Sequence, residues 1–250
     1  NNFLSIVMKN TILFFSFLMI LFIAACKKDK IENSPVPYGD DVIASLDSNQ
    51  VSGFLRVSDT IRIENDTILI PLDTTVKAEF FDLGDLSNPN PVFINSLSVN
   101  GATVPHSNFI GYFSSLPGKT IIPAIWDVKG TSIIPDFTFT NLKGMPFYNY
   151  RLLPDSIDCS KDYVVPLNGF SNTKYLYYFI HDNVSKSSMI GTPPGDSKSI
   201  TFAHQSLSQF AKSSNASFEI RIENMNYQTL GGKTFAFANE IILLKKITLY

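Results

Sequence analysis

The sequence has few of the residues that carry most catalytic and redox chemistry. Its 250 residues include only two cysteines, three histidines and one tryptophan. Two cysteines allow at most one disulfide within the chain, which excludes a small disulfide-stapled scaffold. The histidines, His106, His181 and His204, form no H-x-x-x-H or H-E-x-x-H pattern, and no G-x-S-x-G, phosphate-loop or dinucleotide motif is present. We therefore predict no catalytic residue, no metal and no cofactor.

An excess of basic charge is also missing. The chain carries 20 Lys and Arg against 22 Asp and Glu, a net charge of −2. This balance argues against a nucleic-acid partner. The composition, 44% apolar and 17% charged, is typical of a globular protein and excludes a disordered chain. The length allows one large domain or two medium ones, each with its own core.

One long apolar segment stands near the start. Residues 11–25 read TILFFSFLMILFIAA, in which only Thr11 and Ser16 are polar. A membrane-spanning helix needs about 20 apolar residues, so this segment is short and typical of a signal peptide. Lys9 supplies the positive charge that precedes such segments. We expect a signal peptide over residues 1–25, with translation starting at Met8. The alternatives are a buried N-terminal helix and an uncleaved membrane anchor.

The apolar segment ends at Ile23-Ala24-Ala25-Cys26, which resembles the lipobox of bacterial lipoproteins. The following Lys27-Lys28-Asp29-Lys30 resembles the polar tether of lipoproteins of the Bacteroidota. The resemblance implies that the sulfur of Cys26 is acylated and that Cys26 becomes the first residue of the mature chain. Acyl chains on Cys26 would then hold the protein on a membrane. Because Lys27 replaces the Asp that can retain such proteins at the inner membrane, we expect the outer membrane, with the periplasmic or surface face open.

The rest of the sequence predicts an all-β protein. Residues 26–40 are polar and serve as a flexible tether after the lipidated cysteine. Beyond them, period-two patterns and β-branched or aromatic runs indicate short strands separated by turn signals. A helical turn is expected within residues 204–212. The expected strands are Val51–Val57, Thr60–Glu64, Thr67–Leu72, Thr75–Phe81, Val92–Val99, Phe109–Phe113, Thr120–Val128, Asp136–Thr140, Asp162–Leu167, Lys174–His181, Ser199–Ala203, Ser217–Glu223, Lys233–Ala238 and Ile241–Leu249.

This succession of short strands and turns predicts two tandem immunoglobulin-like antiparallel β-sandwich domains, over residues 41–130 and 131–250. A single large sandwich or barrel is the alternative. Residues 217–223 show the alternation most clearly. Phe218, Ile220 and Ile222 point one way, and Glu219, Arg221 and Glu223 the other, which predicts a half-buried strand.

Two further patterns suggest contact with sugars. Tyr148 and Tyr150 are candidate aromatics for stacking on a glycan. Four Asp-Ser/Thr pairs, each followed by Ile or Thr, resemble the O-glycosylation sites of exported Bacteroidota proteins. The resemblance makes Thr60, Thr67, Thr74 and Ser156 candidate modified residues. Cys159 has no nearby histidine in the sequence, and we expect a small residue near a strand start rather than a nucleophile.

The sequence therefore predicts a lipid-anchored envelope protein with a binding or scaffolding role and no catalysis. Its partners would be the membrane, through Cys26, and a glycan or an envelope protein. Three alternatives remain. The first is a glycan-binding accessory of a polysaccharide-uptake system. The second is an adhesin or surface-structure subunit. The third is an envelope hydrolase, which would need a pair of facing carboxylates.

Overall fold

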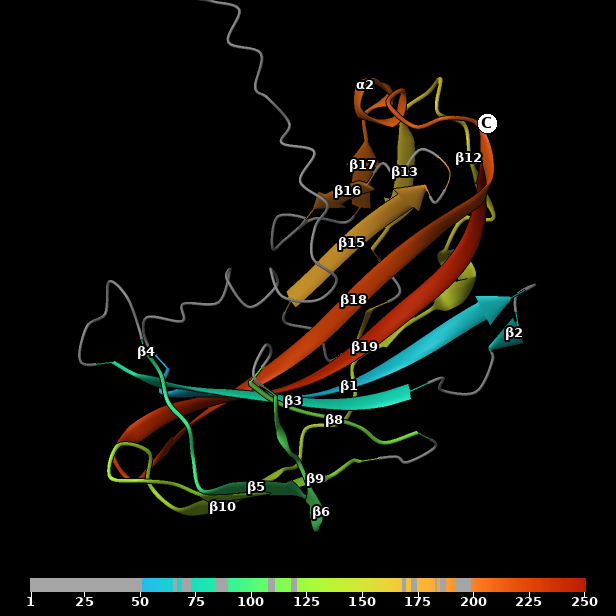
Figure 1. Ribbon diagram of the computed structural model, residues 1–250. Coiled ribbons are helices and arrows are strands. Elements are labelled where there is room, and N and C mark those ends of the chain that lie inside the picture. The colour runs from blue at the N-terminus through green and yellow to red at the C-terminus, as the bar shows by residue number, and fades with distance from the viewer. Residues whose placement is uncertain are drawn as a thin grey trace, which may run out of the picture. The chain divides into compact units, whose positions relative to one another are not determined.

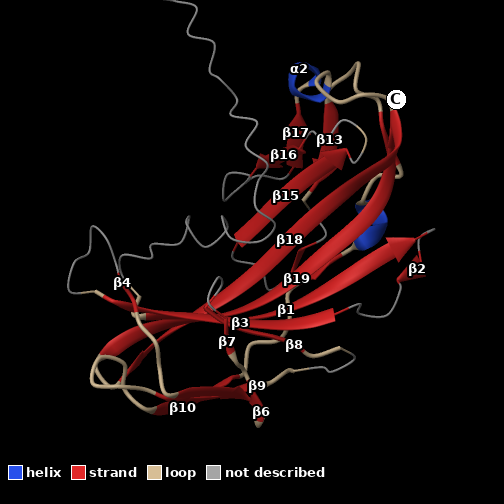
Figure 2. Cartoon of the chain, viewed as in Figure 1, coloured by secondary structure: helices blue, strands red, loops and turns tan. Residues whose placement is uncertain are grey.

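The computed structural model describes residues 51–250 apart from 65–66, 69–72, 84–89, 108–110, 118–120, 168–169, 172–174, 183, 185–187 and 192–198. The signal peptide, Cys26 and the tether expected over residues 1–40 lie outside the described residues. Strands make up most of the described chain (Figure 2). The expectation of an all-β protein is confirmed.

A large mixed sheet forms the centre of the fold (Figure 1). Its two longest strands, β18 (Ser213–Leu230) and β19 (Lys233–Leu249), form an antiparallel hairpin. Gly231 and Gly232 both have positive φ at its turn, as tight hairpins require. Next to β19, on the side away from β18, lies β1 (Gly53–Glu64), which runs parallel to it.

The sheet continues on both sides of these three strands. Antiparallel to β1 lies β3 (Asp73–Asp82), which pairs in turn with β8, and the whole order is β16-β15-β18-β19-β1-β3-β8-β7. Three short strands, β2, β4 and β12, pair with β1, β3 and β19. The remaining bounds in this sheet are β2 Thr67–Ile68, β4 Asn90–Pro91, β7 His106–Ser107, β8 Gly111–Ser115, β12 Ser156–Ile157, β15 Tyr175–Asp182 and β16 Ser188–Gly191.

Smaller elements complete the described chain. A four-stranded antiparallel sheet has the order β10-β9-β5-β6, and two strand pairs, β11 with β14 and β13 with β17, stand apart. The helical turn expected within residues 204–212 is confirmed as α2. The bounds are β5 Ser96–Val99, β6 Ala102–Thr103, β9 Ala124–Lys129, β10 Phe137–Asn141, β11 Phe147–Tyr148, η3 Tyr150–Leu152, β13 Tyr163–Pro166, β14 Phe170–Ser171, β17 Ser199–Phe202 and α2 His204–Leu207.

Two pairs of expected strands are each one continuous strand. The sequence predicts breaks at residues 58–59 and 239–240, but β1 and β19 run through them. The reason is that Ser58 and Glu240 are register partners, and the Ser58 hydroxyl donates a 2.6 Å hydrogen bond to the Glu240 carboxylate. Polar residues that resemble turn signals in isolation therefore satisfy each other inside the sheet.

One face of the large sheet carries two apolar clusters. The first joins Leu55, Val76 and Phe237 to Trp126 and Leu97 of the four-stranded sheet. In the second, Ile220 and Leu243 of the large sheet pack with Val165, Phe202 and Leu207.

A polar belt of three asparagines, two on strands of the large sheet and one on β10, belongs to neither cluster. Asn239 of β19 receives a hydrogen bond from Asn141 and donates one to the Lys143 carbonyl, and Asn224 of β18 donates to the Gly144 carbonyl. Asn141, Asn224 and Asn239 are all buried. The division into two tandem immunoglobulin-like domains stays a prediction, and the large sheet takes strands from both expected segments.

Truncation of Phe237 tests the first cluster. Its buried ring lies 4.1 Å from Phe139 and 6.2 Å from Phe137, centroid to centroid. We expect Phe237→Ala to lower the free energy of unfolding by about 3–5 kcal/mol, because it leaves a cavity. Denaturant titration measures the change, and Phe147→Ala, at a ring that is 54% exposed, is the control with a loss of under about 1 kcal/mol. Equal losses in the two variants would contradict this assignment of the core.

Candidate functional site

A pocket opens at the edge of the large sheet where β3 changes its neighbour. Antiparallel pairing with β8 ends at the Ala78–Tyr112 pair, and pairing with β4 begins at Phe81 and Pro91. Gly111 starts β8 with a φ of +70° and pairs with Ser107 of β7 instead of continuing the ladder with β3. A Cβ at Gly111 would lie 2.7 Å from the Ala78 carbonyl oxygen, so this close turn depends on glycine. The local parting of the strands leaves space along β3.

The pocket has a volume of about 260 Å³. Its lining is mainly apolar and aromatic with a few polar groups, which is the usual make-up of a small-molecule site. Glu79 and Ser107 supply polar side chains, while Phe93 and His106 are exposed at the surface. The full lining is Glu79, Phe80, Phe81, Pro91, Val92, Phe93, His106, Ser107, Gly111 and Tyr112.

Three aromatic rings that line the pocket pack edge to face against one another. Phe93 meets His106 at 4.5 Å between centroids, and His106 meets Tyr112 at 5.2 Å. Tyr112 is buried and fixed at its hydroxyl, which donates to the Ile94 carbonyl at 2.9 Å and accepts from the Ile94 amide at 2.8 Å. The series therefore runs from a fixed buried ring to Phe93, which is 64% exposed. A ligand would meet a firmly supported aromatic surface.

The carboxylate of the pocket belongs to an ion pair. Glu79 lies 3.1 Å from the Lys77 ammonium, and the Glu79 side chain is 22% exposed while that of Lys77 is 9% exposed. Both residues come from β3 and are two positions apart, so they share one face of the sheet. The pair neutralises the charge of Glu79 but leaves its oxygens able to accept hydrogen bonds from the pocket side.

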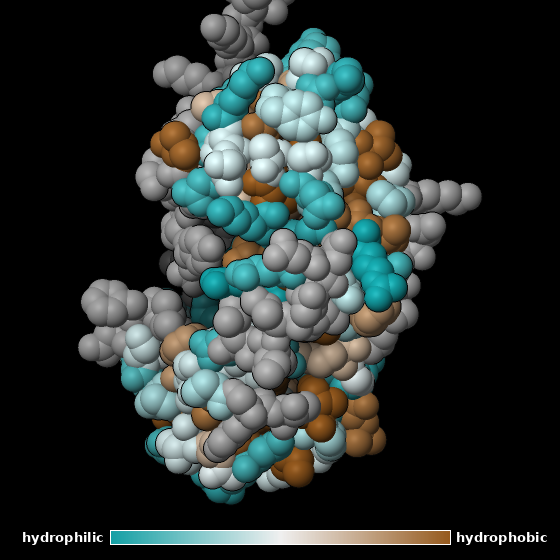
Figure 3. Space-filling view, turned by 90° about the vertical axis from the view of Figure 1, so that its right-hand side faces the viewer, coloured by the Kyte–Doolittle hydropathy of each residue, from teal (hydrophilic) through white to brown (hydrophobic). Residues whose placement is uncertain are grey.

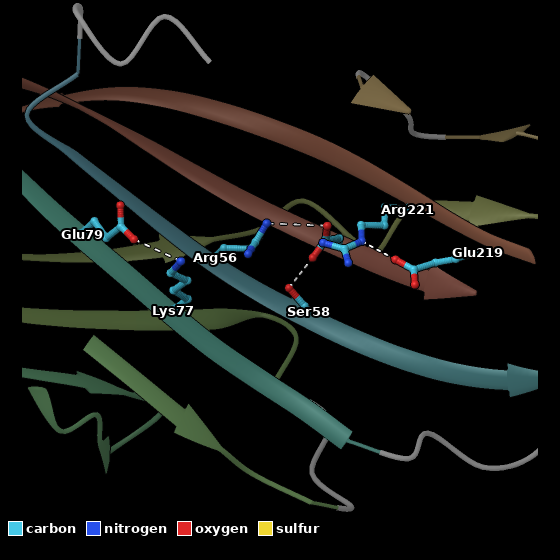
Figure 4. A network of polar contacts seen from close by, with 7 residues as sticks. Arg56, Ser58, Lys77, Glu79, Glu219 and Arg221 are labelled. Atoms are coloured by element: carbon cyan, nitrogen blue, oxygen red, sulfur yellow. Dashed lines mark hydrogen bonds and ion pairs between the residues drawn. The ribbon is translucent and has the colours of Figure 1, made fainter. Parts of the chain in front are cut away.

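A row of charged side chains crosses the sheet on that same face (Figure 4). The charged row consists of Lys77 and Glu79 on β3, Arg56 on β1, Glu240 on β19, Glu219, Arg221 and Glu223 on β18, and His181 on β15. The strand register places residues of the charged row beside one another, because Arg56 is opposite Lys77 and Glu223 is opposite Glu240. The row lies on the reverse side of the sheet from the two apolar clusters.

Most of the charged row is buried. Glu219, Glu223 and Glu240 are at most 2% exposed, and Arg56 and Arg221 are each 6% exposed. The expectation that residues 217–223 form a half-buried strand is therefore wrong, since both of its faces are shielded from solvent. Charge pairing makes this burial tolerable. Arg56 lies 3.6 Å from Glu240, Arg221 donates to Glu219, and His181 lies 3.9 Å from Glu219.

Glu223 differs from the other carboxylates of the row. Neither of its oxygens has a hydrogen-bond partner among the residues that the structure describes, and it faces Glu240 across the strand pair. Burial, and after it the Glu240 charge, raise the pKa of Glu223 to about 8, although the Arg56 charge opposes the rise. Glu223 therefore holds a proton at neutral pH. Burial also lowers the pKa of His181, which keeps its imidazole neutral beside Glu219 and Arg221.

The structure places the two predicted sugar-stacking tyrosines against the second apolar cluster. Tyr148 is 2% exposed and donates a 3.2 Å hydrogen bond to the Pro166 carbonyl, and burial raises its pKa. Tyr150 is half-buried in η3. The expectation of an exposed ring at Tyr148 is therefore not met. Strand alternation turns the neighbouring Phe147 outward instead.

The candidate O-glycosylation sites lie in different environments. Thr74 is 1% exposed and donates a 2.7 Å hydrogen bond to Asp59, so its hydroxyl is not accessible in the folded chain. Thr60 is half-buried, and its register partner is Asp73. Ser156 is exposed in β12. Thr67 belongs to β2, and its side chain lies outside the described residues. Ser156 is the most accessible of the described candidates.

Cys159 is a free thiol that is half-buried. Burial and the neighbouring Asp158 carboxylate raise its pKa, which keeps the thiol protonated and unreactive. Asp158 itself is fixed by Lys161 and Ser160, which lower its pKa to about 2. Over the described ranges, no group of three or more His, Cys, Asp or Glu residues is arranged to hold a metal ion.

The exposed apolar side chains are scattered. On the face drawn in Figure 3, hydrophilic side chains cover much of the described surface, and apolar residues occur in small separate groups. Within the part of the chain that the structure describes, no helix is long and apolar enough to cross a membrane. The exposed large apolar residues are Phe93, Ile125, Ile133, Leu142, Phe147, Val164, Val184, Tyr227 and Tyr250.

Comparisons with protein-family models, curated proteins and solved structures found no match. Sequence reasoning missed the pocket residues Glu79, Phe93 and His106, because they are separated along the chain and meet only through strand pairing. A local signal existed at residues 111 and 112, where glycine precedes an aromatic residue at a strand start, but it does not reveal the partner strands.

Because Glu223 is protonated in the folded chain, we expect the free energy of unfolding to depend on pH. Because its folded pKa of about 8 exceeds the ordinary value of 4.5, the folded state binds more protons than the unfolded state between these limits. The contribution of Glu223 to stability is complete below about pH 4.5 and is lost as the pH rises through about 8. We expect Glu223→Gln, which mimics the protonated acid, to be more stable than the wild type at about pH 9 and similar at about pH 5. Urea titrations at both pH values measure this difference.

Glu64→Gln is the matched control, because Glu64 is an exposed glutamate on β1. This variant should keep the wild-type dependence of the unfolding free energy on pH. A Glu223→Gln variant whose pH dependence equals that of the wild type would show that Glu223 is ionised at neutral pH.

Proposed function

We propose that this chain is a lipid-anchored protein of the bacterial outer membrane that binds a partner and catalyses no reaction. The observation that carries the proposal is the leader of residues 11–25, which ends in the lipobox-like Ile23-Ala24-Ala25-Cys26. Acyl chains on Cys26 would anchor the protein, since at least two such chains give stable membrane attachment. The folded part would then present its surface at the membrane, on the periplasmic or the outer side.

The pocket along β3 supports a binding role over a hydrolytic one. Among the described residues that line it, Glu79 is the one carboxylate, and it is paired with Lys77. A glycosidase would need two carboxyl groups flanking the bond to be cleaved. An aromatic surface with one acceptor suits reversible binding, and the partner would be a glycan or another envelope protein. Two immunoglobulin-like sandwich modules remain part of this proposal.

Metabolic labelling with a palmitate analogue tests the anchor. We expect the wild-type chain to carry the label and to sediment with the outer membrane, and Cys26→Ala to lose the label. Cys159→Ala is the control, because Cys159 is the other cysteine of the chain and should leave the labelling unchanged. Label that persists in Cys26→Ala, or a wild-type chain without label, would refute lipidation at Cys26.

Site accessibility predicts which motif can carry a glycan. If the exported chain is O-glycosylated after folding, Ser156 should be occupied and Thr74 empty, because Thr74 is buried and bonded to Asp59. Peptide mass spectrometry of the protein from its native cells measures both sites. We expect Ser156→Ala to remove the modification and Thr74→Ser to leave it unchanged. A glycan on Thr74 would mean that the modification precedes folding.

A further inference from the structure

We propose that the pocket formed by β3, β4, β7 and β8 binds one neutral sugar ring, stacked on Phe93 with its hydroxyl groups donating to Glu79. This inference rests on the proposed binding role and names the ligand class of that site. It depends on no property of the leader or of Cys26. Three features of the pocket support it: its size, its aromatic surface and its charge balance.

Size favours a single ring. The volume of about 260 Å³ lies just below the range of about 300–1,000 Å³ that is typical of pockets for drug-sized ligands. An extended chain of several sugars would not fit inside. Phe93 and His106 are exposed at the surface, so the pocket is reached from solvent. One ring of a longer glycan, or its terminal residue, can therefore enter while the remainder stays outside.

The aromatic surface suits the apolar face of a sugar. Phe93 is 64% exposed, although large apolar rings are usually buried. His106 and, behind it, Tyr112 support its position through edge contacts. The C–H groups on one face of a pyranose can pack against such a ring and remove apolar surface from water. A ring that its neighbours already support loses little conformational entropy on binding, which favours affinity.

The charge balance of the pocket favours a neutral sugar over an organic cation as the ligand. An aromatic surface beside a carboxylate can also bind an ammonium group. Here Lys77 lies 3.1 Å from Glu79 and is itself nearly buried, so the carboxylate already has its counter-charge. A second cation would be repelled by Lys77, whereas a hydroxyl group can still donate to a carboxylate oxygen. Hydrogen bonds to an ionised acceptor are stronger than those between neutral groups. The geometry thus favours a neutral ligand rich in hydroxyl groups.

Isothermal titration of the protein as it is isolated from the membranes of its native cells tests this inference. The chain is kept in a detergent without a sugar headgroup and titrated with neutral mono- and oligosaccharides of glucose, galactose, mannose and xylose. We expect one or more of these sugars to bind the wild type, and Phe93→Ala and Glu79→Gln each to weaken that binding by roughly tenfold or more. Binding should change little with ionic strength, because the ligand carries no charge.

Two control variants lie outside the pocket. Phe147→Ala removes another exposed phenylalanine, and Glu64→Gln neutralises another glutamate, so both should bind within about twofold of the wild type. Circular dichroism melting of every variant checks the fold, and Glu79→Gln keeps the inference testable if Phe93→Ala unfolds. A glycan array with the same chain then identifies the preferred sugar.

Three results would overturn the inference. The first is a wild-type chain that binds none of the neutral sugars. The second is an equal loss of affinity in the pocket variants and the controls. The third is salt-sensitive binding of a trimethylammonium compound without binding of any neutral sugar, which would identify a cation site. Palmitate labelling separates this inference from the proposed anchor. A labelled chain that binds no sugar would refute the sugar ligand and leave the anchor in place. An unlabelled chain that binds sugar would refute the anchor and leave the ligand in place.

Discussion

The hydrogen bond between Ser58 and Glu240 is the contact on which the remaining structure depends. It joins residues 182 positions apart and fixes the parallel register of β1 and β19 at a polar position in the middle of both strands. A shift by one residue would turn every apolar side chain of β1 to the opposite face. With the register fixed, Arg56 reaches Glu240, Asn239 joins the polar belt, and the two apolar clusters occupy the same face. The polar positions thus specify the pairing, while the apolar clusters supply most of the favourable free energy.

Local features of the fold were predictable, and long-range pairing was not. Period-two patterns predict most strands, and the helical turn expected within residues 204–212 is α2. The sequence around residues 58 and 239 indicated breaks, because a serine next to an aspartate or an asparagine next to a glutamate resembles a turn when no partner is known. The polar face of β18 resembled a solvent-exposed face for the same reason. Alternation shows which side chains share a face but does not show what shields that face.

The candidate site shows the same limit. The lipobox-like motif at Cys26 is contiguous, and so the sequence alone suggested it. The pocket needs Glu79 from β3, Phe93 from the segment after β4 and His106 from β7, and only the change of strand neighbours at Gly111 brings them together. Residue type alone favours Tyr148 as a stacking ring, but the pleat of β11 places its ring inside and that of Phe147 outside. Residue type identifies an aromatic side chain as a candidate for stacking, but the backbone conformation determines which face of the strand carries it.

The central position of β19 has a consequence for how the chain reaches its native state. Because β19 lies between β18 and β1, the middle ladder of the sheet cannot assemble until residues 233–249 have left the ribosome. Contacts between segments this remote form slowly. An incomplete polypeptide therefore lacks the strand that pairs with both β18 and β1. If the leader of residues 11–25 directs export as proposed, this strand order suits passage through a narrow secretory pore, because the central ladder of the sheet forms only when its last strand arrives.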